Sequence, residues 1–128
     1  KLAKSIGVNK LINFKGSRRD IPEILSKFDI FVFSALEDEG FGIAMVEAMI
    51  SGIPILASEV GACLEILDNG EYGFFFKKGC PKDLALKVFE MSNNIKNVNE
   101  KVFKAKKYAK KHFSVESMAD SYFNFLML

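Results

Sequence analysis

The chain has 128 residues, of which 49% are hydrophobic and 27% are charged, and this is the composition of one ordinary globular domain. Such a balance excludes a disordered chain. The net charge of +2 and the lack of a long apolar run argue against a nucleic-acid-binding protein and against a membrane-spanning one, so we expect no nucleic acid among the partners.

Four short apolar runs are predicted to be strands. They are rich in aromatic and β-branched residues, and their continuous apolar character is typical of strands covered on both faces, as in a parallel sheet. The runs are 11–14, 29–33, 53–57 and 74–76.

Helical patterns lie between these runs and after them. We expect the helices at 20–28, 42–51, 61–67, 81–91, 97–112 and 114–128. Asp20 with Glu23 forms a capping pair for the first helix, and Gly52 is a typical stop for the second. The last helix carries an apolar stripe, which we expect to pack in a core or against another domain.

The alternation of strands and helices predicts an α/β fold, with a Rossmann-like doubly wound parallel sheet of about four strands, helices on both faces and a helical C-terminal tail. There is no internal repeat and no linker, so residues 1–128 are expected to form one domain. The chain opens on Lys1 with the end of a helix and no strand before it, so we expect an upstream segment to be missing.

The loops that follow the strands form the candidate site, because ligands of such sheets bind at the carboxyl ends of the strands. The loop after the second predicted strand holds Gly40 and Gly42 and leads directly into a helix. Glycine lets a ligand approach the main chain closely, and the free N–H groups at a helix start favour an anion such as a diphosphate.

Folding alone does not explain why a charged residue, Glu47, stands in the middle of that helix. The helix is otherwise apolar from Ile43 to Ile50, so we expect it to be buried, where a carboxylate is costly unless it is hydrogen-bonded. A ribose diol would offset that cost by donating two hydroxyl protons, and an ion pair with a neighbouring Lys or Arg is the structural alternative. Glu39 stands at the mouth of the helix, whose start lies about 8 Å from Glu47, so the two carboxylates can bracket one elongated ligand.

At these residues the sequence resembles the group 1 (family 4) retaining glycosyltransferases of the GT-B fold. The resemblance rests on Glu39-Gly40-Phe41-Gly42 with Glu47-Ala48-Met49, followed by the segment from Ser51 to Ser58 with its Gly-x-Pro motif. It covers nearly the whole chain, and the two glutamates with seven residues between them are its specific part.

The resemblance implies that the chain is the nucleotide-sugar-binding C-terminal domain, lacking its first strand and the N-terminal acceptor domain. Glu39 would be the catalytic residue that contacts the donor hexose, and Glu47 would hold the ribose hydroxyls. The remaining donor-binding residues would be Gly40, Phe41, Gly42 and Ile43 at the sugar and diphosphate, and Gly16, Ser17 and Arg18 beside the nucleobase.

The family moves a sugar from a nucleoside-diphosphate sugar to a saccharide or lipid-linked acceptor, which implies a role in polysaccharide or glycoconjugate biosynthesis. No cofactor and no metal are expected in this domain. Cys63 and Cys80 lack metal-ligand spacing and are expected to be reduced thiols. We therefore expect a cytoplasmic enzyme, with peripheral association of the full-length protein at the inner face of the membrane.

Two departures from the family pattern bear on the site. Glu37 and Asp38 lengthen the loop, so Glu37 competes with Glu39 for the contact with the donor sugar. The diphosphate-binding Arg and Lys of the family lie upstream of this chain, so the isolated chain is expected to bind donor weakly and to transfer nothing. Two alternatives stay open, a nucleotide-sugar epimerase of the same fold and a non-catalytic nucleotide-sugar-binding module.

Overall fold

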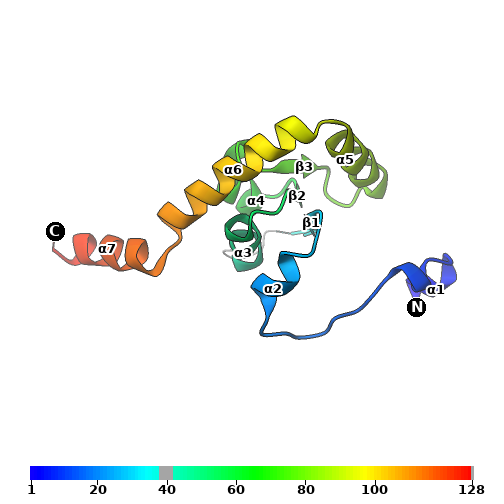
Figure 1. The fold of residues 1–128 in the computed structure, drawn as a ribbon, viewed down its shortest axis with the longest axis horizontal. Helices are drawn as coiled ribbons and strands as arrows, with labels where there is room; N and C mark the ends of the chain where they lie inside the picture. The colour runs from blue at the N-terminus through cyan, green and yellow to red at the C-terminus, as the bar shows by residue number, and fades with distance from the viewer. Residues whose placement is uncertain (38–41, 128) are drawn as a thin grey trace.

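The computed structural model describes residues 1–37 and 42–127, and the centre of this part is a parallel sheet of three strands (Figure 1). The strands are β1 (Phe31–Phe33), β2 (Ile55–Ser58) and β3 (Phe74–Phe76), and β2 lies between the other two. Each is a short apolar run predicted from the sequence. The α/β class and the parallel sheet are therefore confirmed.

The first predicted strand, 11–14, is wrong. The chain instead forms a short helix α1 (Leu2–Ser5) and a 3₁₀ turn η1 (Asn9–Leu11), and residues 12–14 pair with none of the described strands. Phe14 remains 86% exposed. An apolar run has the composition of a strand, but a strand also needs a neighbour for its backbone N–H and C=O groups, and this segment runs away from the sheet (Figure 1).

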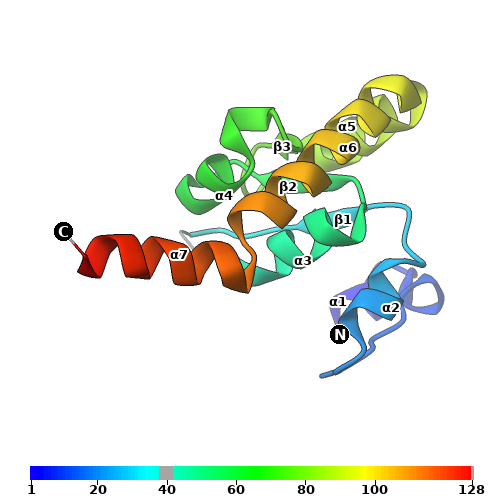
Figure 2. The same cartoon turned by 60° about the vertical axis from the view of Figure 1, so that its left-hand side comes forward.

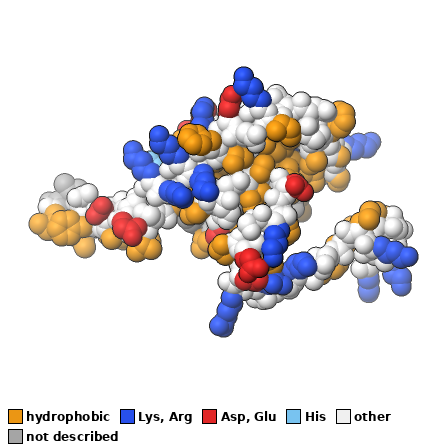
Figure 3. Space-filling view, in the orientation of Figure 1, with side chains coloured by type: hydrophobic (Ala, Val, Ile, Leu, Met, Phe, Trp, Pro, Cys, Tyr) orange, Lys and Arg blue, Asp and Glu red, His pale blue; other side chains and the backbone are white. Residues whose placement is uncertain are grey.

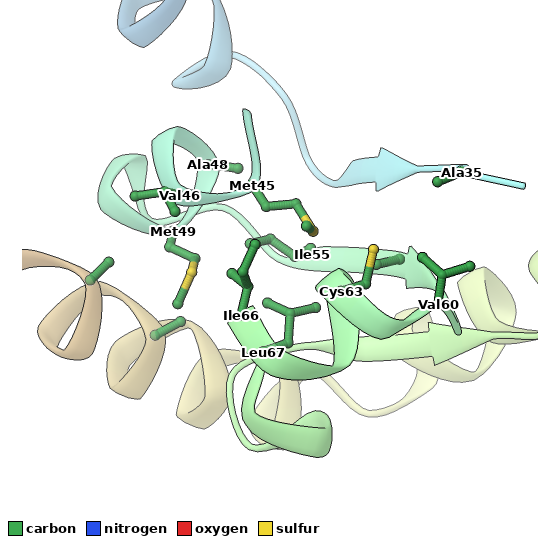
Figure 4. Close-up of a cluster of buried hydrophobic side chains, with 13 residues drawn as sticks. Ala35, Met45, Val46, Ala48, Met49, Ile55, Val60, Cys63, Ile66 and Leu67 are labelled. Atoms are coloured by element: carbon green, nitrogen blue, oxygen red, sulfur yellow. The ribbon is translucent and has the colours of Figure 1, made fainter. Parts of the chain in front are cut away.

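Side chains on the first face of the sheet form the larger core layer. Ile55 and Ala57 of β2 pack there against the helices α3 (Ile43–Ser51) and α4 (Gly61–Ile66). Figure 4 shows the side chains of both helices meeting over β2, with Met45 among them. This layer fixes α3 against the sheet and thereby fixes the start of α3 at the edge where the strands end.

The second face of the sheet carries a smaller layer. Leu56 and Phe76 pack there against Met91 of α5 (Pro81–Asn93) and Val98 of α6 (Ile95–His112). Because neighbouring residues of a strand point to opposite faces, Leu56 belongs to this layer while Ile55 and Ala57 belong to the other. Helices thus cover both faces, as predicted.

Helix α6 contributes to both layers. Val98 near its start lies in the second layer, whereas Ala105 and Ala109 near its end lie in the first. Lysine side chains line its outer surface, where Figure 3 shows a row of basic groups. The prediction that this basic run is the solvated face of a helix is confirmed.

The start of α2 differs from the prediction, whereas the start of α7 is capped by a side chain. Asp20 is the N-cap of α2 (Ile21–Leu25), but its carboxylate makes no cap hydrogen bond and pairs with Arg18 instead. Ser114 does cap α7 (Val115–Leu126), accepting from the N–H of Ser117 at 3.1 Å. None of the residues in α7 is buried, so its apolar stripe is not part of a core of the described chain, and the core alternative for that stripe is wrong.

Candidate functional site

Three loops leave the sheet at the carboxyl ends of its strands. Leu36, in the loop after β1, lies close to Gly79 in the loop after β3, since a Cβ built on that glycine would lie 3.6 Å from Cδ2 of Leu36. The strand β2 ends at Ser58, whose hydroxyl contacts the chain leaving β1. These contacts gather the loops at one edge, which is where ligands of open parallel sheets bind.

The predicted residues of the first loop fall partly outside the described residues. Glu39, Gly40 and Phe41 lie there, so the proposed catalytic glutamate has no structural account. Glu37, the competing carboxylate, is described and is exposed to solvent. The choice between Glu37 and Glu39 therefore stays open.

Gly42 marks the point where the loop enters α3. Its φ of 68° lies in the left-handed region, which glycine adopts at little cost. A Cβ at this position would lie 2.7 Å from Cε of Met45 and 2.9 Å from Cδ1 of Ile66. Gly42 is the N-cap without a side chain to cap it, so the first N–H groups of α3, including that of Ile43, face the end of the helix.

Glu47 lies one turn further along α3 and is half-buried. Ile43 and Ile50, on the same side of the helix, are 66% and 38% exposed. The expectation that α3 is buried all round is therefore wrong: the helix packs through Met45, Val46, Ala48 and Met49 and leaves its Glu47 side open. Among the residues that the structure describes, the Glu47 carboxylate has no hydrogen-bond or ion-pair partner, so the structural alternative, an ion pair with a neighbouring Lys or Arg, is not found there.

The loop predicted to lie beside the nucleobase precedes the sheet in the chain. Gly16, Ser17 and Arg18 precede α2, and α2 leads to the start of β1 and not to its carboxyl end (Figure 2). The guanidinium of Arg18 donates to both carboxylate oxygens of Asp20, at 2.8 and 2.5 Å. The role of this loop at the nucleobase stays a prediction.

Ser58, at the end of β2, is a residue at this edge that the sequence reasoning did not single out. It is fully buried and is the sole buried polar residue among those described. Its hydroxyl accepts from the backbone N–H of Ala35 at 2.8 Å and lies 3.4 Å from the carbonyl oxygen of Phe33. A polar residue ending a four-residue apolar strand was the available signal in the sequence.

An apolar cavity of about 610 Å³ lies at a different place, the corner between α6 and α7. Phe113, Met118, Tyr122 and Phe125 line much of it, together with His112 at the end of α6. None of the predicted site residues contributes to this cavity.

Across residues 1–37 and 42–127, no three acidic, histidine or cysteine side chains gather as metal ligands would, and no helix combines the length and hydropathy needed to cross a membrane.

Comparison with known sequences identifies one family. The model of the family described as glycosyl transferases group 1 matches residues 1–112. A Campylobacter jejuni protein named N,N'-diacetylbacillosaminyl-diphospho-undecaprenol alpha-1,3-N-acetylgalactosaminyltransferase is 35% identical over 77 residues, which is 60% of this chain and 20% of that protein. A putative glycosyltransferase of Bacillus subtilis, EpsD, is 28% identical over 124 residues, which is 94% of this chain and 32% of the relative.

Solved structures of similar fold extend the comparison. The Anabaena protein HepE in complex with UDP and glucose superposes with a TM-score of 0.90 at 25% identity, and the match covers 98% of this chain and 34% of HepE. Sucrose-phosphate synthase from Thermosynechococcus elongatus superposes with a TM-score of 0.85 at 19% identity, which shows a shared fold. The chain thus spans about a third or less of each of these relatives.

Proposed function

Since this chain belongs to the group 1 glycosyltransferases and has the fold of their GT-B structures, we propose that it is the C-terminal, donor-binding part of a longer retaining enzyme. The full enzyme would move a sugar from a nucleoside-diphosphate sugar to a saccharide or lipid-linked acceptor. Its product would keep the anomeric configuration of the donor, which NMR of the product can test. By itself this part would bind donor weakly and transfer nothing.

The observation that carries the proposal is the Glu47 carboxylate, which has no hydrogen-bond or ion-pair partner within residues 1–37 and 42–127. It is half-buried on the open side of α3, between the exposed side chains of Ile43 and Ile50. A carboxylate there keeps both oxygens available as acceptors, and a ribose diol offers two hydroxyl donors at matching spacing. The HepE complex with UDP, a nucleotide that contains ribose, supports a donor of this kind.

The start of α3 provides the second part of the proposed site. Because the N-cap Gly42 makes no side-chain hydrogen bond to the first amide groups of the helix, a diphosphate can bind these groups, and the helix dipole favours its negative charge. Ile43 and Glu47 then follow along the same side of the helix. The donor would lie with its phosphates at the helix start, its ribose at Glu47 and its sugar toward Glu37 or Glu39.

Substitution of Glu47 by Gln in the full-length enzyme tests this assignment. Gln keeps one acceptor, so about one charge-assisted hydrogen bond is lost, worth roughly 1.5–3 kcal/mol. Affinity for the nucleoside diphosphate should therefore fall about tenfold to a hundredfold in calorimetric titration with UDP, GDP and ADP. Thermal stability should change little, because the carboxylate is only half-buried and has no described partner.

The matched control is Glu100→Gln on the exposed surface of α6, which should leave both affinity and melting unchanged. If Glu47→Gln binds the nucleotide as the wild type does but melts at a much lower temperature, Glu47 is a structural residue and the proposed site is wrong. A wild-type enzyme that binds none of the three nucleotides would overturn the proposed function itself.

A further inference from the structure

The hydroxyl of Ser58 replaces a backbone hydrogen bond at the end of the sheet. In the parallel pairing of β1 with β2, the N–H of Phe31 donates to the carbonyl of Pro54, so the same ladder continued to Ala35 would use the carbonyl of Ser58. That carbonyl instead accepts from the N–H of Val60 at 2.9 Å. The Ala35 N–H donates to the Ser58 hydroxyl, at 2.8 Å.

The carbonyl and the hydroxyl of Ser58 each hold one of the two loops that leave β2 and β1. With its carbonyl engaged by Val60, β2 turns at once into the loop that leads to α4. With its hydroxyl engaged by Ala35, the same residue holds the chain that leaves β1. One buried residue therefore engages both loops: its hydroxyl holds the chain that leaves β1, and its backbone carbonyl holds the chain that leaves β2.

The chain leaving β1 changes environment directly after this contact. Ala35 is 7% exposed and belongs to the larger core layer, whereas Leu36 is 67% exposed and Glu37 is exposed as well. Ala35 is thus the last anchored residue before the candidate carboxylate. The amide hydrogen bond to Ser58 is an anchor of that residue besides its packing in the core.

We propose that Ser58 is a positioning residue for sugar transfer, whose hydroxyl fixes the backbone at Ala35 and thereby places the Glu37 carboxylate, one of the two candidates for the contact with the donor sugar. This role rests on the proposed function. Under this proposal two different residues act at one edge of the sheet. Glu47 on α3 binds the nucleotide, whereas Ser58 orders the loop that contacts the transferred sugar. Ser58 acts through the backbone of Ala35 and does not itself touch the donor.

The test compares Ser58→Ala with Ser58→Thr in the full-length enzyme. Alanine leaves the Ala35 N–H without its acceptor, so amide exchange at Ala35 and Leu36, followed by NMR, should quicken about tenfold to a hundredfold. Turnover should fall about tenfold to a hundredfold, because a small misplacement of a reacting group is costly. Affinity for the nucleoside diphosphate should stay within about twofold of wild type, and threonine, which keeps the hydroxyl, should restore both exchange and turnover.

Two further variants provide a second test of Ser58 and a control. Ser58→Cys keeps a side chain of similar shape with a much weaker acceptor, so it should repeat the alanine result if alanine fails to fold. Ser26→Ala removes an exposed hydroxyl that donates to the carbonyl of Glu23, and it should change neither readout. Unchanged exchange at Ala35, or unchanged turnover with only a lower melting temperature, would overturn the role of Ser58. Failure of the wild type to bind any nucleotide would instead overturn the proposed function, while the exchange at Ala35 would still report on the hydrogen bond.

Discussion

The guanidinium of Arg18 binds the Asp20 carboxylate through two hydrogen bonds, and this pair offers a measurable report on the loop before α2. The hydrogen bonds from Arg18 lower the pKa of Asp20 from its ordinary 3.8 to about 2. Because the folded-state pKa is lowered, the stabilising effect of the pair is present above pH 4 and is lost as the pH falls toward 2. Both side chains are exposed, so the effect on stability is small.

Arg18→Gln should return the pKa of Asp20 toward its ordinary value, as followed by NMR of the carboxyl carbon. Arg19→Gln should leave it unchanged, because Asp20 is paired with Arg18. If Arg18 also contacts a bound donor, as the family resemblance implies, then UDP added at neutral pH should shift the NMR signal of the Arg18 Nε–H. A signal that stays in place while the enzyme binds UDP would remove Arg18 from the donor site.

At the scale of the element, α3 is bounded by two glycines in the left-handed conformation, Gly42 with φ 68° and Gly52 with φ 75°. Alanine at either position should lose about 1–2 kcal/mol through backbone strain. At Gly42 the added Cβ would also press on Met45 and Ile66, whereas at Gly52 it would make only ordinary contact with Lys106, at 3.5 Å. Gly42→Ala should therefore cost about 1–2 kcal/mol more than Gly52→Ala in urea unfolding.

Equal costs for the two variants would show that the tips of Met45 and Ile66 move aside freely. The close approach at Gly42 would then not be what requires glycine at the start of α3. A larger loss of stability for Gly42→Ala would show that the contacts with Met45 and Ile66 are what require glycine at the start of α3.

The same helix illustrates how much of the fold the sequence could predict. The helix 42–51 was predicted almost to the residue because glycines at both ends are local signals. The strands at β2 and β3 were recognised because their residues are apolar on both faces. The segment 11–14 was mistaken for a strand because pairing depends on a neighbour, which composition does not reveal.

The site could be predicted less completely than the fold. The two glutamates follow a motif that is visible in the sequence, but the open side of α3 around Glu47 depends on which neighbours pack against the helix. The partners of Arg18 and Ser58 likewise depend on the folded structure and are not visible in the sequence. Asp20 is predicted to cap α2 but pairs with Arg18, and the hydroxyl of Ser58 accepts a hydrogen bond from a residue 23 positions away, which the sequence does not reveal.

At the scale of the whole molecule, α6 holds the two core layers together. Val98 packs against the face of the sheet that carries Leu56, and Ala109 packs against the opposite layer beneath α3. The chain then turns at Phe113, which still contacts the larger layer and meets Tyr108 edge to face at 5.7 Å between ring centroids. Beyond this turn α7 leaves the core, and Figure 3 shows apolar side chains exposed toward its free end.

Removal of α7 should therefore leave the fold of the 128-residue chain nearly as stable as before. The helix buries no residue, and isolated helices of its length are marginal in water, so a chain ending at Ser114 should unfold within about 0.5 kcal/mol of the intact chain in urea. Its melting temperature should move by only a few degrees. Phe113→Ala in the intact chain provides the contrast, because it removes a partly buried ring from the larger core layer and should cost about 1–3 kcal/mol. If the truncation costs as much as Phe113→Ala, then α7 packs on the core in solution, and the stability of this chain depends on a contact that its extended position does not show.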